Sequence, residues 1–358
     1  DAEATDRLEV LLKDAISRQM IADVPLGAFL SGGIDSSTVV ALMQAQSSRP
    51  VRTFTIGFNE VAYNEAGHAA DVARHLGTDH TTLIVEPRDA LAVIPKLADI
   101  YDEPFADASQ IPTMLLSELT RRHVTVALSG DGGDELLAGY TRYGVAEQRW
   151  AMLSRIPRHL AKAASAAGLM LSASNWDRML GAVPTAIQSR LTGESARGFA
   201  AVLGAGGFGE LYRRQLSHWA DPALLMPGDA EAKGLAFDPA LDTLFPDVVD
   251  RMRYLDTLTY LPDDILTKVD RASMNVSLEA RVPLLDHRVV ELCWRLPKHQ
   301  MVRDGTTKWL LRNVLGRHVP AALINRPKMG FGVPIDSWLR GPLRDWAESL
   351  LSETELRR

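Results

Sequence analysis

The sequence predicts an α/β fold in which helices flank a parallel sheet, with an additional helical part towards the C-terminus. Up to Leu128, short apolar runs typical of buried strands alternate with longer runs of helical periodicity. Two of the strand-like runs end in loops rich in glycine, serine and aspartate. The composition, with 46% hydrophobic and 23% charged residues, is ordinary for a folded globular protein.

The expected elements follow one another along the chain. An amphipathic helix opens it at Asp6–Ala22, where apolar residues recur at helical spacing. Strands are expected at Pro25–Leu30, Val51–Gly57, His80–Val85 and His123–Leu128. Helices are expected after the first strand to about Gln46 and at Asn64–Leu76, Ala90–Tyr101 and Ile111–Arg122. In such sheets ligands bind outside the carboxyl ends of the strands, where the strand order reverses.

The composition also suggests how the chain is organised. Residues 1–148 hold the expected sheet, and residues 149–250, rich in Ala, Leu and Gly, predict a variable helical region. Residues 251–358 return to a strong helical pattern, which closes with an amphipathic helix after Gly341. We expect this last part to complete the site that the sheet begins.

Charge and cysteine content exclude several classes of protein. The net charge of -6 argues against binding to a nucleic-acid backbone. The single cysteine, Cys293, excludes an internal disulfide and suits a reducing cytosol, so a cytoplasmic location is expected. The best membrane candidate, Ala163–Trp176, is too short for the roughly 20 residues that a bilayer requires. The charged first residues are followed by no apolar signal-peptide core.

The first unusual loop is SGGIDSS at Ser31–Ser37, between a predicted strand and a predicted helix. Glycines there let a ligand approach the backbone, and the amides at the helix start favour an anion such as phosphate. Asp35 makes sense beside phosphate if Mg²⁺ lies between them. The loop lacks the lysine of a P-loop and the third glycine of a dinucleotide fingerprint. The alternative is an ordinary capped helix start.

The second loop is SGDGGDE at Ser129–Glu135, after the fourth predicted strand. Taken alone, it is also compatible with a solvated acidic turn, which is the less favoured interpretation. With both loops at the same edge of a sheet, a polyphosphate between them would bring Asp35 and Asp134 to one Mg²⁺. No Ser-His-Asp or Cys-His pattern stands out, and no histidine has metal-ligand spacing. We therefore expect chemistry on a nucleotide by positioning and electrostatics.

The first loop resembles the signature of the PP-loop ATP pyrophosphatases, which split ATP between its α and β phosphates and adenylate a substrate. Further segments resemble, in order and spacing, the synthetase (C-terminal) domain of bacterial glutamine-hydrolysing asparagine synthetases, and the resemblance covers residues 1–358. It implies a Rossmann-like (adenine nucleotide alpha hydrolase-like) sheet. These segments are Asp102–Glu118, Leu128–Tyr143, Tyr260–Glu291, Asp304–Arg312 and Arg326–Asp345.

The resemblance implies a two-step reaction with ATP as a substrate and Mg²⁺ as the cofactor. The side-chain carboxylate of aspartate attacks the α-phosphate, which gives β-aspartyl-AMP and pyrophosphate. Ammonia then displaces AMP, and asparagine results.

The resemblance also implies roles for individual residues. Asp35 and Asp134 hold Mg²⁺, and Ile56 and Gly57 contribute backbone contacts to the adenine. The whole ATP-binding set is Phe29, Leu30, Ser31, Gly32, Gly33, Asp35, Ser36, Ser37, Ile56, Gly57, Ser129 and Gly130.

Two residues are expected to be catalytic on the same basis. Asp131 stands where many relatives have glutamate and β-lactam-forming relatives have tyrosine, and it is tied to intermediate formation and ammonia attack. Lys308 matches a lysine that stabilises charge at the α-phosphate and pyrophosphate. From spacing alone, Lys308 would be a solvated helix residue.

Other charged positions invite a structural interpretation. A group of charged residues lies in an expected helical stretch. Most of them are interpreted as members of ion pairs that hold this helical stretch against the sheet. The group is Asp263, Asp264, Lys268, Asp270, Arg271, Glu279 and Arg281. The Lys328–Pro334 segment is a candidate flap over the site.

The expected partners are a small carboxylate, with aspartate first, and ammonia. The full enzymes of the family carry an N-terminal glutaminase domain with a catalytic cysteine as first residue, and the 358 residues here contain none. A glutaminase domain or subunit is therefore expected as the ammonia source, and a homodimer is the assembly to test. No nucleic acid and no membrane are expected as partners.

Alternatives stay open at this point. The same chemistry could act on another carboxylate, such as a uronic acid of a surface polysaccharide, because no residue is assigned to the α-amino or α-carboxylate group of aspartate. A β-lactam product is disfavoured by Asp131, and a tRNA-modifying ligase by the acidic charge. A nucleotide-binding pseudo-synthetase would predict loss of the charged positions, yet Asp35, Asp131, Asp134 and Lys308 are all present.

Overall fold

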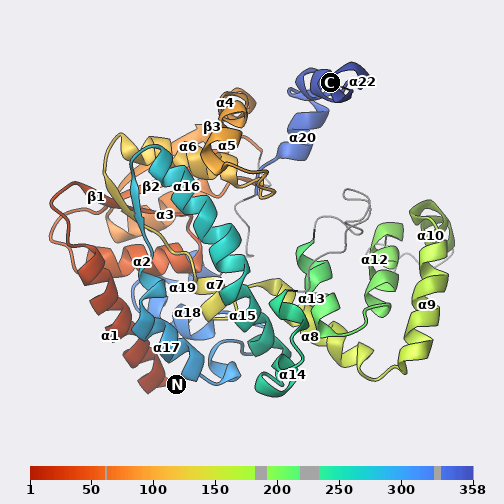
Figure 1. Ribbon diagram of the computed structural model, residues 1–358. Helices are drawn as coiled ribbons and strands as arrows, with labels where there is room; N and C mark the ends of the chain where they lie inside the picture. The colour runs from red at the N-terminus through yellow and green to blue at the C-terminus, as the bar shows by residue number, and fades with distance from the viewer. Residues whose placement is uncertain (61–62, 182–191, 218–233, 326–331, 358) are drawn as a thin grey trace. The chain divides into compact units, whose positions relative to one another are not determined.

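The computed structural model describes residues 1–60, 63–181, 192–217, 234–325 and 332–357. The chain forms two compact units (Figure 1). The first unit comprises Asp1–Gly139 and Thr257–Arg358, and the second comprises Tyr140–Asp256.

The first unit is built on a parallel sheet, as the sequence predicted. In the described residues the sheet has five strands in the order β3-β2-β1-β4-β5, and every neighbouring pair is parallel. Ala28 in β1 pairs with Thr53 in β2 on one side and with Leu128 in β4 on the other. The strands are β1 Leu26–Phe29, β2 Arg52–Phe58, β3 Asp79–Val85, β4 Val126–Leu128 and β5 Glu279–Arg281.

The fifth strand was not expected, because Glu279 and Arg281 were assigned to a helical stretch, and that assignment is wrong. Glu-Ala-Arg has neither the β-branched residues nor the apolar alternation that predict a strand. It is extended because it pairs with β4: Glu279 N donates to the Thr125 carbonyl at 2.9 Å, and Ser129 N donates to the Arg281 carbonyl at 2.8 Å.

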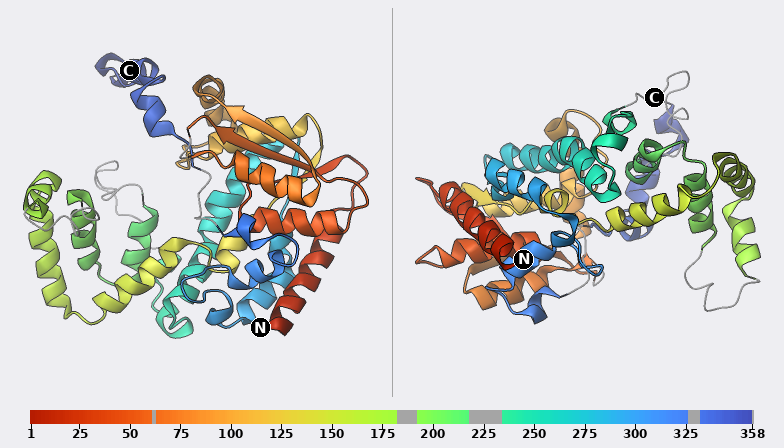
Figure 2. Two further views of the ribbon diagram at one scale, coloured as in Figure 1. Left: turned by 180° about the vertical axis from the view of Figure 1, so that it is seen from behind. Right: turned by 90° about the horizontal axis from the view of Figure 1, so that it is seen from below.

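Helices cover both faces of the sheet (Figures 1 and 2). The helices α2, Ile34–Ala45, and α3, Ala66–Leu76, lie on one side, and α3 packs on β2 and β3. On the other side, α6, Gln110–Arg121, packs on β2 and against α16, Thr267–Asn275. Phe54 of β2, Met114 of α6 and Ala272 of α16 belong to one buried apolar cluster.

The remaining helices of the first unit surround this core. The expected helix at Ala90–Tyr101 is divided at Pro95 into shorter pieces, since proline cannot donate a helical hydrogen bond. A π-helical turn, η5, spans Leu261–Leu266. The other helices are α1 Ala2–Gln19, α4 Pro87–Val93, α5 Leu97–Tyr101, α7 Gly133–Leu136, α17 His287–Arg295, α18 Trp309–Leu315, α19 Ala321–Ile324, α20 Ile335–Arg340, α21 Arg344–Leu350 and α22 Glu353–Leu356.

An ion-pair cluster joins α1 to the chain after α18. The Glu9 carboxylate contacts Lys13 at 2.7 Å, Arg317 at 2.5 Å and His318 at 3.0 Å. Burial alone would raise the pKa of Glu9, but these three side chains outweigh it and lower the pKa to about 2.

The second unit is helical in its described residues. Its fully buried Asp256 carboxylate accepts hydrogen bonds from Arg142 at 2.7 Å, Tyr143 at 2.6 Å and Tyr212 at 2.8 Å. The helices are α8 Thr141–Leu153, α9 Arg158–Met170, α10 Ala173–Leu180, α12 Gly193–Leu203, α13 Phe208–Leu216, α14 Leu241–Leu244 and α15 Val248–Leu258, which contains the boundary with the first unit. Among the described helices of the whole chain, none has the length and apolar character to cross a membrane.

Candidate functional site

Both motif loops emerge at the carboxyl edge of the sheet, from the two strands at its centre. The chain leaves β1 for β2 on one side and later returns to β4 on the other side, so the strand order reverses between β1 and β4. This is the position at which open parallel sheets bind ligands. The structure therefore brings Ser31–Ser37 and Ser129–Glu135 together, as the sequence predicted.

The first loop is a tight turn closed by its own serines. Ser31 N donates to Ser36 Oγ at 3.2 Å, and Gly33 N donates to Ser31 Oγ at 3.2 Å. Gly32 has φ +72°, and a Cβ there would lie 2.9 Å from the Ala69 nitrogen in α3. The helix α2 begins directly after Gly33 with no side-chain cap on its first amides. Those amides point out of the helix start, which suits an anion.

The second loop packs directly on the first. A Cβ at Gly130 would lie 2.6 Å from the Ser36 nitrogen, and a Cβ at Gly133 would overlap the Asp35 carboxylate. Only glycine admits this approach of β4 to the first turn of α2. The short helix α7 then carries Asp134.

Lys308 joins the two loops through their carboxylates. Its Nζ contacts the Asp35 carboxylate and lies 2.9 Å from Asp134 Oδ1, although Lys308 is 273 residues from Asp35 in sequence. The side chain is 6% exposed. Burial alone would lower the pKa of the Lys308 ammonium, but Asp35 and Asp134 outweigh it and raise the pKa above its ordinary value.

The backbone at Lys308 and a nearby glycine make this arrangement fit. Lys308 has φ +54°, which is uncommon for a non-glycine residue, and it precedes the first residue of α18. A Cβ at Gly139 would overlap both the Lys308 side chain and the Asp134 carboxylate. Gly139 closes the AGY turn after α7, and the sequence reasoning missed its role because no local pattern marks it.

Asp131 interacts electrostatically with this cluster and with a second lysine, Lys268. Ser129 Oγ donates to Asp131 Oδ2 at 2.5 Å. Burial raises the pKa of Asp131 above its ordinary value, while the Ser129 hydrogen bond and the charges of Lys268 and Lys308 act in the opposite direction. A carboxyl group of this kind is a better proton acceptor than an ordinary aspartate.

The second lysine belongs to an ion pair that links α16 to the loop before α6. Lys268 Nζ lies 2.5 Å from Asp107 Oδ2, and the Tyr101 hydroxyl donates to the Lys268 carbonyl at 3.2 Å. One turn further along α16, Arg271 pairs with Asp102. Lys268 and Arg271 thus form ion pairs as expected, but their partners lie in the segment between α5 and α6 and not in the sheet. Arg281 of the same expected group pairs with Glu279 within β5. The sequence reasoning did not connect Lys268 with Asp131.

The other predicted ATP-binding residues lie at or near the same edge. Phe29 ends β1, and Leu30 N donates to the Phe54 carbonyl at 2.9 Å. Ile56 is buried in β2, where it pairs with Leu83 of β3. Gly57 follows it in β2, and Ser37 has a buried side chain in α2. Most of the expected flap at Lys328–Pro334 lies outside the described residues.

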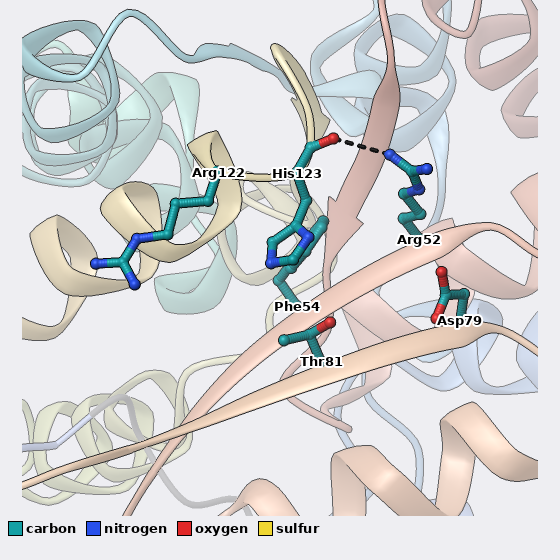
Figure 3. Close-up of a pocket in the computed structure, with 6 residues that line it drawn as sticks. All are labelled: Arg52, Phe54, Asp79, Thr81, Arg122 and His123. Carbon is teal, nitrogen blue, oxygen red and sulfur yellow. Dashed lines mark hydrogen bonds between the residues drawn. The ribbon is translucent and has the colours of Figure 1, made fainter.

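A pocket of about 230 Å³ lies at the opposite end of the strands from the motif loops, where β2 and β3 have their amino ends (Figure 3). It is formed where β2 and β3 begin and where α6 has ended, so it is separate from the motif loops at the carboxyl ends of the strands. Arg52 donates to the His123 carbonyl at 2.8 Å, and the Phe54 and His123 rings lie 5.5 Å apart. The lining residues are Arg52, Phe54, Asp79, Thr81, Arg122 and His123.

Comparison with known proteins agrees with this geometry. Residues 7–358 match the family model described as asparagine synthase. The chain is 32% identical over 349 residues to glutamine-hydrolysing asparagine synthetase 1 of Bacillus subtilis, which is 96% of this chain and 51% of the relative. It is 34% identical over 361 residues to a putative glutamine-hydrolysing asparagine synthetase of Mycobacterium bovis, 99% of this chain and 52% of the relative.

A shorter match is found to a putative glutamine-hydrolysing asparagine synthetase 2 of Methanocaldococcus jannaschii, 44% identical over 151 residues, which is 42% of this chain and 29% of the relative. The chain spans about half the length of the bacterial relatives that it matches throughout. The family model, in contrast, covers almost the whole chain. The chain belongs to the asparagine synthase family.

Proposed function

We propose that this chain is an ATP-dependent amide-forming ligase that adenylates the side-chain carboxylate of aspartate and transfers ammonia to it. The observation that carries the proposal is the convergence of Asp35, Asp134 and Lys308 at the point where the strand order reverses. The two carboxylates suit a metal cation, and the ammonium and the amides of the glycine-rich helix start suit the phosphates that the cation accompanies.

The first loop and the start of α2 would hold the phosphates of ATP. Ser31, Ser36 and the amides at the start of α2, which has no side-chain cap, would provide the donors, and the backbone of Ile56 and Gly57 would contact the adenine. Ser129 and Gly130 complete the nucleotide site from β4, where Gly130 already touches α2.

The donor set also fits Mg²⁺. Asp35 and Asp134 reach the same Lys308 nitrogen, so their oxygens face one small volume. In the described residues no group of three or more histidine, cysteine or acidic side chains is placed to hold a metal ion. Mg²⁺ prefers one or two carboxylates together with substrate phosphates and water, and when bound there it would neutralise charge on pyrophosphate.

In the first step, a carboxylate oxygen of aspartate attacks the α-phosphorus. The bond between that phosphorus and the bridging oxygen to the β-phosphate breaks, and pyrophosphate leaves with the electron pair. Lys308 stabilises the charge that develops on the phosphates, because a buried ammonium is a strong electrostatic partner where water is excluded.

In the second step, ammonia attacks the acyl carbon of β-aspartyl-AMP, and AMP leaves with the electrons of the acyl–oxygen bond. The new C–N bond requires that nitrogen lose a proton. The Asp131 carboxylate accepts it, and the burial that raises its pKa makes it a better base. We propose that a glutaminase domain or subunit outside these 358 residues supplies the ammonia.

The test is ATP–pyrophosphate exchange with Mg²⁺, in which aspartate is compared with a panel of other acids that includes glucuronate. We expect aspartate-dependent exchange, formation of AMP rather than ADP, and asparagine on addition of ammonium. Exchange with glucuronate but not with aspartate would overturn the assignment of aspartate. Formation of ADP would overturn the adenylation chemistry.

Lys308→Ala tests the central residue. We expect the variant to lose exchange while ATP binding, measured by calorimetry, survives. Lys96→Ala is the matched control, since Lys96 lies in an exposed pair 3.9 Å from Glu118 and should exchange like wild type. An active Lys308→Ala enzyme would remove Lys308 from the site.

A further inference from the structure

Asp131 is close enough to Lys268 to interact with its charge, and Lys268 is in turn paired with Asp107. Asp131 follows β4, Lys268 lies in the first turn of α16, and Asp107 precedes α6. Lys268 and Asp107 form an ion pair at 2.5 Å, with exposed side-chain fractions of 9% and 23%. The Tyr101 hydroxyl donates a hydrogen bond to the Lys268 carbonyl at 3.2 Å, which fixes the helical turn that carries the lysine.

This ion pair lies at the same edge of the sheet as Asp131 and the phosphate loop. Asp107 precedes α6, which leads into β4, and Lys268 lies near the start of α16, which leads into β5. Because β4 and β5 are parallel to β1, the starts of both helices lie at the carboxyl edge of the strands. An acid whose carboxylate reaches the α-phosphate near Asp131 would therefore extend its other end towards α16. The side chains near that end include the Lys268 ammonium and the Asp107 carboxylate, both of which are partly buried.

We propose that Lys268 and Asp107 recognise the α-carboxylate and the α-ammonium of the acceptor amino acid, and so select aspartate over acids that lack either charge. This inference rests on the proposed ligase function. The α-carboxylate of aspartate would bind Lys268, and its α-ammonium would bind Asp107. Two ion pairs with the substrate would thus replace the single pair between Lys268 and Asp107. A uronic acid offers hydroxyl groups in place of the ammonium and leaves Asp107 without a matching charge.

The energetics of buried ion pairs favour a role for Lys268 and Asp107 in recognising the substrate over a role in stability. A buried ion pair contributes little net stability because desolvation offsets the attraction, so stability alone is a weak reason for it. A site built to pair with a charged group discriminates strongly against an analogue that lacks the group, since its own charge is then left buried and unpaired. The partial exposure of Asp107 also leaves one side of the pair open to a ligand.

The experiment compares acceptors in the ATP–pyrophosphate exchange of the intact chain. Succinate lacks the ammonium, β-alanine lacks the α-carboxylate, and both keep the reacting carboxylate. We expect the wild type to prefer aspartate over either analogue by roughly 10- to 100-fold in kcat/KM. Lys268→Met should lower kcat/KM for aspartate towards that for β-alanine, and Asp107→Asn should lower it towards that for succinate.

Each variant should lower kcat/KM for its own analogue much less than for aspartate, because that analogue lacks the group which the side chain binds. Lys268→Arg, which keeps the charge, should retain a preference for aspartate over β-alanine. Lys96→Met serves as the control for removing a lysine from an ion pair, and it should keep the wild-type selectivity. The melting temperature of each variant shows whether it is folded at the assay temperature.

The outcomes separate this inference from the function on which it rests. If the wild type uses aspartate and both variants lose activity equally with every acid, the pair is structural and the inference is wrong. Unchanged selectivity in folded variants overturns it as well. If the wild type uses glucuronate and not aspartate, the proposed function itself fails, and the variants are not needed to show it.

Discussion

Lys308→Met is the most informative single change to the stability of the site. Methionine has nearly the same length as lysine but no charge, so the variant leaves the Asp35 and Asp134 carboxylates facing each other without their common cation. Breaking a buried ion pair by removing one partner costs about 3–5 kcal/mol. Because the two carboxylates are 19% and 20% exposed, water screens part of the repulsion, and we expect the lower end, about 3 kcal/mol.

Differential scanning calorimetry without nucleotide at neutral pH measures this cost. For a unit the size of the first one, about 3 kcal/mol corresponds to a decrease in Tm of roughly 6–12 °C. Adding Asp35→Asn to Lys308→Met should recover part of the loss, since one of the two repelling charges is then removed. Mg²⁺ should raise the Tm of Lys308→Met more than that of the wild type, in which the lysine already offsets part of the charge of the two carboxylates.

The reasoning is refuted if Lys308→Met changes the Tm no more than the exposed control Lys96→Met. It is equally refuted if the effects of Asp35→Asn and Lys308→Met are additive, because contacting charges must couple. A normal stability with no response to Mg²⁺ would mean that the carboxylates do not share one cation.

Further predictions concern the rest of the chain. Glu9→Gln should destabilise the fold by about 3 kcal/mol at pH 7, and the difference from wild type should vanish as the pH falls from 4.5 towards 2 in acid denaturation, because a carboxylate with a lowered pKa stabilises only while ionised. Gly130→Ala should weaken ATP binding at least tenfold in calorimetry, since its Cβ would press on the Ser36 nitrogen; an unchanged affinity would show that β4 can move away from α2 at no cost. Asp256→Asn should lower the free energy of unfolding of the second unit by about 3 kcal/mol in urea, because the partly buried Arg142 loses its charged partner; a change below about 0.5 kcal/mol would contradict this reasoning.

The phosphate site could be predicted from local sequence for a physical reason. Parallel strands all point the same way, so loops that follow them must lie at the same edge. The runs ending at Leu30 and Leu128 were therefore enough to predict that Ser31–Ser37 and Ser129–Glu135 lie close together. The glycines in both loops also showed where backbone must approach backbone, as Gly130 does at Ser36.

What local patterns could not reveal were the partners that come from distant parts of the chain. The strand at Glu279–Arg281 has no strand-like periodicity and exists because β4 offers it hydrogen bonds. Lys308 looks like a surface residue until the fold brings it to Asp35, and the resemblance to a family was needed to single it out.

The sequence alone determined the class of fold, the edge at which a ligand is proposed to bind and the resemblance to a family, because these depend on strand periodicity and on motifs that are each local in sequence. The tertiary structure decided which charges face each other: Lys308 with Asp35 and Asp134, and Lys268 with Asp107, which lies 161 residues away. Periodicity reports only whether a face is buried, whereas an ion pair depends on where two separate segments cross.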